Sequence, residues 1–149
     1  MSPSKKRFQV LIESTVNFVV LEKPVSKLIR RIFSDEDFDI QGSLSLVFVD
    51  DEHIRQLNRN YLKHDYPTDV IAFPLEDESD DLWGEIYISV DRAREQAAQY
   101  REPFRREVAR LIIHGMLHLI GYEDLDPAQA RKMKAVEEHY LSKYGDIVL

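Results

Sequence analysis

Two histidines four residues apart are the side chains of this sequence with the clearest capacity for chemistry. His114 and His118 interrupt the run 108–120, which is apolar almost all round and therefore predicts a buried helix. In such a helix this spacing places the two side chains about 40° apart around the axis and about 6 Å apart along it. The two imidazoles are therefore expected to converge on one metal ion.

A glycine and two acidic residues follow the histidines. Gly121 can adopt a positive φ angle and end the helix in a tight turn, which would bring Glu123 and Asp124 back toward His114 and His118. Asp124 completes the pattern His-x3-His-x5-Asp, the spacing of a known three-ligand turn, and Glu123 is the rival third ligand. Three protein ligands leave the fourth position of a tetrahedral zinc ion open for water, which is typical of a catalytic site. Such an ion lowers the pKa of its bound water to about 7.

The donor atoms available restrict the choice of metal. The chain has no cysteine, so thiolate metal sites, disulfides and cysteine nucleophiles are excluded. Nitrogen and oxygen ligands favour Zn²⁺ and leave Ni²⁺ or another borderline metal open. Alternatively, His114 and His118 are core residues that hydrogen-bond to carbonyl groups. Unpartnered polar groups are costly to bury, and Gly121 and Asp124 follow at suitable positions, so we favour a site for one transition-metal ion.

Composition and charge exclude several classes of partner. The formal net charge is −7, which argues against a general polyanion binder, and no DNA partner is expected. No apolar run approaches the roughly 18 residues that a membrane span requires, so no membrane partner is expected. The N-terminal segment lacks a long apolar core and a small-residue cleavage site. The expected location is therefore the cytoplasm.

The elements that must position the histidines follow from the periodicity of apolar residues. Strands are predicted at 44–50, 69–73 and 85–90, and at least one of 8–12 and 17–21 is a strand. Helices are predicted at 24–34 (opened by Pro24), from Asp50-Asp51 to about Leu62, from the cap Asp91 to about Tyr100, from Pro103 to about Ile120, and from Asp126-Pro127 to about Tyr144-Gly145. Without repeats or linkers, we predict one compact α/β (α+β) domain over 1–149, a mixed sheet of about four strands packed by helices.

The segment 114–124 resembles the signature of the YbeY family of metal-dependent endoribonucleases, His-Gly-x-Leu-His-Leu-x-Gly-Tyr-Asp-His. Two further family-like blocks stand at 57–74 and 84–89, and the resemblance covers roughly 40–145. It implies a compact α/β fold with the metal at the base of a cleft. It also implies cleavage of single-stranded RNA in ribosomal RNA maturation, including the small-subunit 3′ end, and in ribosome quality control. Ribosomal small-subunit components would be the partners.

The sequence departs from the family pattern at two positions. Asp124 stands at the family's third histidine, so the metal-bound water is expected to be less acidified. Leu62 stands where the family usually has an arginine thought to serve RNA binding or catalysis. Arg59 lies one helical turn earlier and could reach the same side. His64, in the following loop, could act as an acid or base near pH 7. Arg59 and His64 are thus the candidate catalytic residues.

Two other functions compete with an endoribonuclease. The first is a ribosome-assembly factor with a structural metal and little nuclease activity, which the loss of the usual arginine favours somewhat. The second is a metallopeptidase. Metzincin proteases carry their general-base glutamate directly after the first histidine, and this position is Gly115 here. A peptidase of that kind would lack its base, so this function is disfavoured.

Overall fold

The computed structural model of the chain describes residues 8–18, 20, 22–38, 42–63, 68–75 and 82–148. Its strands are β1 (Gln9–Ser14), β2 (Ser43–Val49), β3 (Val70–Pro74) and β4 (Leu82–Ser89). Its helices are α1 (Glu22–Asp35), α2 (Asp51–Leu62), α3 (Val90–Tyr100), α4 (Phe104–Ile120) and α5 (Pro127–Tyr144), followed by a short 3₁₀ helix, Gly145–Val148. None of the helices described is long and apolar enough to cross a membrane.

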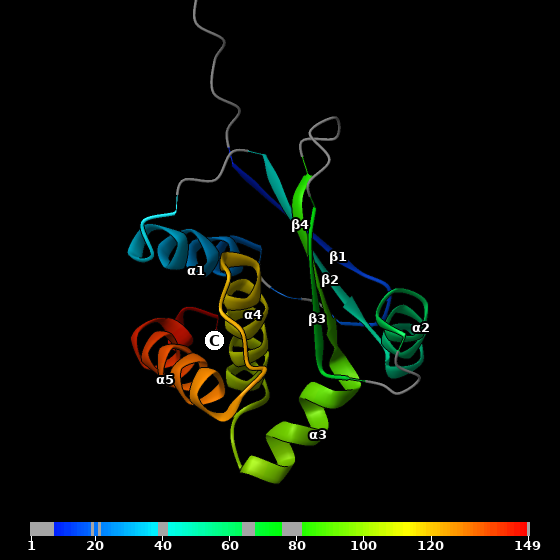
Figure 1. The fold of residues 1–149 in the computed structure, drawn as a ribbon. Helices are drawn as coiled ribbons and strands as arrows, with labels where there is room; N and C mark the ends of the chain where they lie inside the picture. Colours follow the sequence, from blue (N-terminus) through cyan, green and yellow to red (C-terminus); the bar gives the residue numbers. More distant parts are fainter. Residues whose placement is uncertain are drawn as a thin grey trace, which may run out of the picture.

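The strands form one mixed sheet in the order β1-β2-β4-β3. β1, β2 and β4 run parallel, and β3 pairs antiparallel with β4 at the edge. Helix α2 lies on one face of the sheet, whereas α1, α4 and α5 lie on the other (Figure 1). The predicted α/β class with a mixed sheet of four strands is therefore confirmed.

The strands alternate their side chains between two apolar clusters. Leu46, Phe48 and Ile86 belong to the large core shared with α1, α4 and α5. Val47 and Val49 belong to a smaller cluster with Ile54 of α2 and Ile71 of β3. This period of two residues is what a sheet covered on both faces requires. Helix α4, which carries both histidines, packs on this sheet against β3 and β4.

Helix α4 is buried as predicted, with ten of its 17 residues buried. Gly115 lets it approach the sheet closely, because a Cβ atom at this position would lie 2.8 Å from Cγ2 of Ile86 and 3.3 Å from Cγ2 of Val70. Any other residue at this position would require the Ile86 side chain to shift. The residue between the two histidines therefore fixes how deeply α4 sits on the sheet.

The structure corrects or refines three local predictions. Ser89, not Asp91, caps α3, because its Oγ accepts the N–H of Arg92, while the Asp91 carboxylate accepts the N–H of Asp51. Of the two N-terminal candidates, 8–12 contributes the strand. The described residues of 17–21 are not in a strand, because Phe18 turns inward to pack on Phe48 and Phe104. Helix α1 begins at Glu22, two residues before Pro24.

Candidate metal centre

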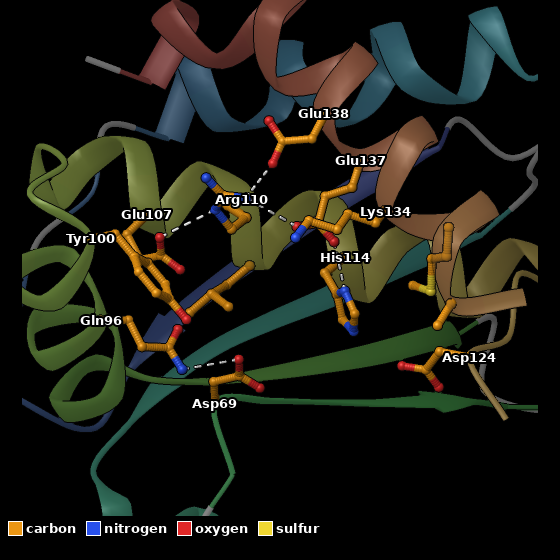
Figure 2. A pocket seen from close by; sticks show the side chains of 13 residues that line it. Asp69, Gln96, Tyr100, Glu107, Arg110, His114, Asp124, Lys134, Glu137 and Glu138 are labelled. Atoms are coloured by element: carbon orange, nitrogen blue, oxygen red, sulfur yellow. Dashed lines mark hydrogen bonds and ion pairs between the residues drawn. The ribbon is translucent and has the colours of Figure 1, made fainter. Parts of the chain in front are cut away.

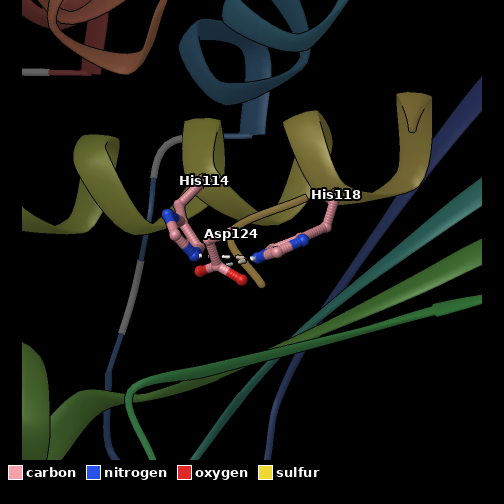
Figure 3. Close-up of side chains that lie close together, drawn as sticks. All are labelled: His114, His118 and Asp124. Carbon is pink, nitrogen blue, oxygen red and sulfur yellow. Dashed lines mark hydrogen bonds and ion pairs between the residues drawn. The ribbon is translucent and has the colours of Figure 1, made fainter. Parts of the chain in front are cut away.

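The two histidines of α4 point to the same side of the helix and face each other. The Nε2 atoms of His114 and His118 lie 3.0 Å apart, as the four-residue spacing predicts (Figure 3). Both rings are only partly exposed, with 27% and 32% of the side-chain surface accessible. Two imidazole nitrogens therefore meet at the base of a recess that solvent can reach.

Hydrogen bonds on the far side of each ring determine which nitrogen carries the proton. The Nδ1 of His114 lies 2.8 Å from Oε2 of Glu137, and the Nδ1 of His118 lies 3.1 Å from the carbonyl oxygen of Tyr122. A carbonyl oxygen and an ionised carboxylate only accept hydrogen bonds, so both Nδ1 atoms must donate. In the neutral imidazoles the proton is then absent from Nε2.

The facing Nε2 atoms consequently direct two lone pairs at each other. At 3.0 Å this arrangement is unfavourable unless a proton or a cation lies between the rings. Two nitrogens bound to one tetrahedral zinc ion at about 2.0–2.1 Å would lie about 3.4 Å apart, a separation that a small ring rotation provides. The donor set and its orientation therefore fit a transition-metal ion.

Asp124 is the third member of the cluster. Its Oδ2 lies 3.8 Å from Nε2 of His118, and one ligand atom from each of the three residues lies within 4.8 Å of the others. In the part of the chain that the structure describes, this is the only such group of three, and it does not include Glu123. The geometry thus places Asp124, rather than Glu123, beside the two histidines.

The turn that brings Asp124 back depends on Gly121. This residue has a φ angle of 123°, a conformation that side chains disfavour. Its N–H and that of Tyr122 both bond to the carbonyl oxygen of Leu117 and so end α4, as the sequence predicts. The same turn presents the Tyr122 carbonyl to His118. One glycine therefore supports both the position of Asp124, the third member of the cluster, and the tautomer of His118.

The cluster opens into a cavity of about 490 Å³ between α3, α4, α5 and the start of β3 (Figure 2). Its wall contains His114 and Asp124 together with apolar atoms of Leu111 and Met133. The remaining charged groups of the wall are four carboxylates and two cations: Asp69, Glu107, Glu137, Glu138, Arg110 and Lys134. With Asp124 included, acids outnumber cations by five to two. The cavity favours a cation over a free anion.

Arg110, which lies one turn before His114 on α4, forms ion pairs with three of these carboxylates. Its guanidinium lies 2.6 Å from Glu138, 3.2 Å from Glu107 and 3.5 Å from Glu137. Glu137 thus contacts a cation on one oxygen and a histidine on the other. The chain His114–Glu137–Arg110 fixes the imidazole from behind, as second partners of metal-binding histidines commonly do.

Sequence reasoning did not find Glu137, although a signal was present. On α5 the buried positions lie along one face at helical intervals: Met133, Glu137, Tyr140, Leu141 and Tyr144. An acidic residue on an otherwise apolar face needs a buried partner, because unpaired buried charges are costly. Glu137 is 8% exposed, and its partners are His114 and Arg110.

The two imidazoles differ in basicity. Burial lowers the pKa of His114, but the hydrogen bond and charge of Glu137, together with Asp69 and Asp124, outweigh burial and raise that pKa overall. Burial and the nearby His114 lower the pKa of His118. Glu137 therefore makes the His114 ring the more strongly electron-donating of the two toward any cation between them.

The structure separates the two candidate catalytic residues from this cluster. Arg59 is exposed on α2 and is not among the described residues that line the cavity. His64 lies outside the described residues, as do its neighbours 65–67 and the acidic segment 76–81. Leu62, at the position of the family arginine, is exposed at the end of α2.

The sequence profile of the family described as Endoribonuclease YbeY matches residues 10–145 of the chain. The chain belongs to the YbeY family. Its relatives include the Endoribonuclease YbeY of Acholeplasma laidlawii, 39% identical over 88% of this chain and 89% of that protein. The homologue of Carboxydothermus hydrogenoformans is 45% identical over 70% of this chain and 73% of that protein.

A solved structure supports the same relationship. A Thermotoga maritima protein whose structure was determined in solution is 26% identical to this chain, with a TM-score of 0.61. The match covers 91% of this chain and 88% of that protein. The resemblance that the sequence motifs indicate is thereby confirmed. It reaches further toward the N-terminus than residue 40, because the YbeY profile begins at β1.

Proposed function

We propose that this chain is a metal-dependent endoribonuclease that cleaves single-stranded RNA during ribosomal RNA maturation, including the small-subunit 3′ end, and in ribosome quality control. Its location would be the cytoplasm, and its partners would be ribosomal small-subunit components. The observation that carries the proposal is the pair of Nε2 lone pairs held 3.0 Å apart beside Asp124 in a cavity. The names of the relatives, which specify an endoribonuclease, supply the reaction class.

His114, His118 and Asp124 are the proposed ligands of one transition-metal ion, with Zn²⁺ preferred and Ni²⁺ as the alternative. The chemistry that such an ion supplies when bound is Lewis-acid activation of water and of a phosphate oxygen. The carboxylate of Asp124 adds a negative charge that a third histidine would not. We therefore expect a less acidic bound water than at a site with three histidines.

The chain's own residues then have distinct tasks. Glu137 and the Tyr122 carbonyl hold the protons on Nδ1 and keep both Nε2 atoms free to bind. Arg59 is the proposed cation that offsets charge on the phosphoryl oxygens, and His64 is the proposed acid or base. Both assignments follow from the resemblance to the YbeY family and from their positions in the sequence.

The two competing functions receive less support. An assembly factor with a structural metal would not need the cluster to open into a cavity, and the relatives are named as nucleases. A metallopeptidase would need a general base at position 115. The Gly115 Cα faces Ile86 and Val70 of the sheet at distances that leave no room for a side chain. The peptidase alternative is therefore disfavoured by packing as well as by sequence.

A comparison of three protein samples tests the proposal. Purified wild-type protein, a His114→Ala variant and metal-stripped protein are incubated with single-stranded RNA and with casein. We expect the wild type alone to cleave RNA and none of the samples to cleave casein. His139→Ala is the matched control, because His139 is an exposed histidine on α5 outside the cluster.

The outcomes separate the candidate functions. Equal RNA cleavage by wild type and His114→Ala would exclude this site as the origin of the activity. Casein cleavage would favour the peptidase, and a metal-loaded protein without RNA cleavage would favour the assembly factor. A 2′,3′-cyclic phosphate on the products would identify the ribose hydroxyl, rather than water, as the nucleophile. Reduced RNA cleavage by Arg59→Gln and His64→Gln would support their proposed roles.

A further inference from the structure

A second hollow, of about 530 Å³, runs along the exposed side of α1 and reaches the end of α5. We call it the basic groove. Its charged wall residues and its one aromatic residue are Lys23, Lys27, Arg30, Arg31, Asp35 and Tyr144. Four cations and one carboxylate thus line it, the reverse of the charge balance in the metal cavity.

The single carboxylate of the basic groove is already compensated. Asp35 accepts hydrogen bonds from Nζ of Lys143 at 2.9 Å and from the hydroxyl of Tyr144 at 2.5 Å. These two hydrogen bonds lower the pKa of Asp35, so it stays ionised and paired with its own neighbours. It is therefore a weak competitor for the four cations of the groove.

Three of the cations remain available. The Arg30 guanidinium is occupied, because it donates to the carbonyl oxygen of Phe8 at 2.7 Å and to Oγ of Ser26 at 3.2 Å. Lys23, Lys27 and Arg31 form no hydrogen bond or ion pair with any residue that the structure describes. Their charges are therefore directed to solvent and can meet an anionic ligand.

The three free cations form a regular row. Lys23, Lys27 and Arg31 follow one another at four-residue intervals on one face of α1, so successive Cα atoms are about 6 Å apart along the axis. This step is similar to that between successive phosphates of an extended nucleic-acid strand. A row of single charges at such intervals suits a backbone better than it suits one compact anion.

The metal cavity and the basic groove lie at the two ends of the same helix. Glu137 of α5 lines the cavity, and Tyr144 of α5 lines the groove seven residues later, about 10 Å along the axis. Helices α1 and α5 lie on the same side of the sheet in Figure 1, and their C-terminal ends are joined by the bonds from Lys143 and Tyr144 to Asp35. A strand of a few nucleotides can therefore reach from one site to the other.

The net charge of the chain bears on which ligand the basic groove binds. With a net charge of −7 and an acid-rich metal cavity, the protein needs a separate cationic surface to hold a polyanion. Resting on the function proposed above, we propose that the basic groove binds the backbone phosphates of single-stranded RNA that flank the cleavage point. Lys23, Lys27 and Arg31 make the contacts, without regard to base sequence.

The test compares two double variants that lose the same charge. Lys27→Gln with Arg31→Gln alters the groove. Arg94→Gln with Arg101→Gln removes two exposed arginines, one in α3 and one at its C-cap, and α3 lies away from α1 in Figure 1. Binding of labelled 2′-O-methyl RNA is followed by fluorescence anisotropy at several salt concentrations, with a strand of about 20 nucleotides and with a dinucleotide, which is too short to span the metal cavity and the basic groove.

For the longer strand we expect the groove variant to bind about tenfold more weakly near physiological salt, with a salt slope smaller by about 1.4, because each lost phosphate contact removes about 0.7. The short strand should bind the wild type and both variants equally.

The proposal would be overturned if the groove variant bound the longer strand as tightly as the wild type, or if the α3 variant lost as much affinity as the groove variant. An acidic protein would then be the alternative partner of the basic groove. Equal weakening for both strands would also overturn the proposal. Because binding alone is measured, absent RNA cleavage by wild type would refute the proposed function without affecting this result.

Discussion

Removing the carboxylate behind His114 should weaken metal binding without altering any proposed ligand. Glu137 lies 2.8 Å from Nδ1 of His114 and is 8% exposed, so water screens this contact little. Loss of such a partner typically costs about ten- to hundredfold in metal affinity. This range corresponds to roughly 1.4–2.8 kcal/mol at 25 °C.

Two substitutions of Glu137 should reduce metal affinity by different amounts within this range. Glu137→Gln keeps an oxygen that accepts the proton of His114 but removes the negative charge, so we expect a loss near tenfold. Glu137→Ala removes the acceptor as well and leaves the ring free to rotate, so we expect a loss nearer hundredfold. Arg110 keeps its contacts to Glu107 and Glu138 in both variants, which limits the effect on the fold.

Competition with a coloured chelator for Zn²⁺ at fixed pH measures the metal dissociation constant. Glu138→Gln is the matched control, because Glu138 also contacts Arg110, at 2.6 Å, whereas the carboxylate that bonds to the His114 ring is that of Glu137 (Figure 2). The free energy of unfolding of the metal-free proteins reports any general damage. The reasoning fails if both Glu137 variants bind Zn²⁺ as tightly as the wild type, or if Glu138→Gln loses as much affinity.

Three further changes have defined outcomes. Asp124→Ala should lower the metal content below the roughly one ion per chain expected for wild type, whereas Glu123→Ala should not. Elemental analysis measures this content. Equal metal contents of the two variants would remove the basis for choosing Asp124 as the ligand. Gly115→Ala should reduce the free energy of unfolding by about 1–3 kcal/mol in urea, because its Cβ would meet Cγ2 of Ile86 at 2.8 Å; an unchanged stability would contradict this packing. Burial raises the pKa of the Glu107 carboxyl, although Arg110 opposes this change. The folded protein therefore keeps a proton that the unfolded chain has already lost. The free energy of unfolding then falls as pH rises from the pKa of the unfolded chain toward the pKa of the folded protein. Glu107→Gln should therefore gain stability relative to wild type as pH rises above about 4.5 in urea titrations, and a constant difference would refute it.

Local patterns were sufficient for most of the fold. The helices are visible as apolar residues at intervals of three and four, and their ends as Asp126-Pro127 and Gly121, because these signals act within one or two turns. The N-cap of α3 was misassigned to Asp91. Ser89 and Asp91 are both good capping residues, and the choice depends on the bonds of Asp91 to Asp51, a residue 40 positions away.

The sequence by itself determined the cluster of His114, His118 and Asp124, because a helical repeat and one glycine turn are local geometry. Only the tertiary structure brought Glu137 and Arg110 behind the first histidine and joined α1 to the end of α5 as the wall of the basic groove. These contacts join separate helices, and their formation depends on how α4 packs on the sheet. No interval along the chain encodes that packing, since it is set by the summed burial of many apolar side chains.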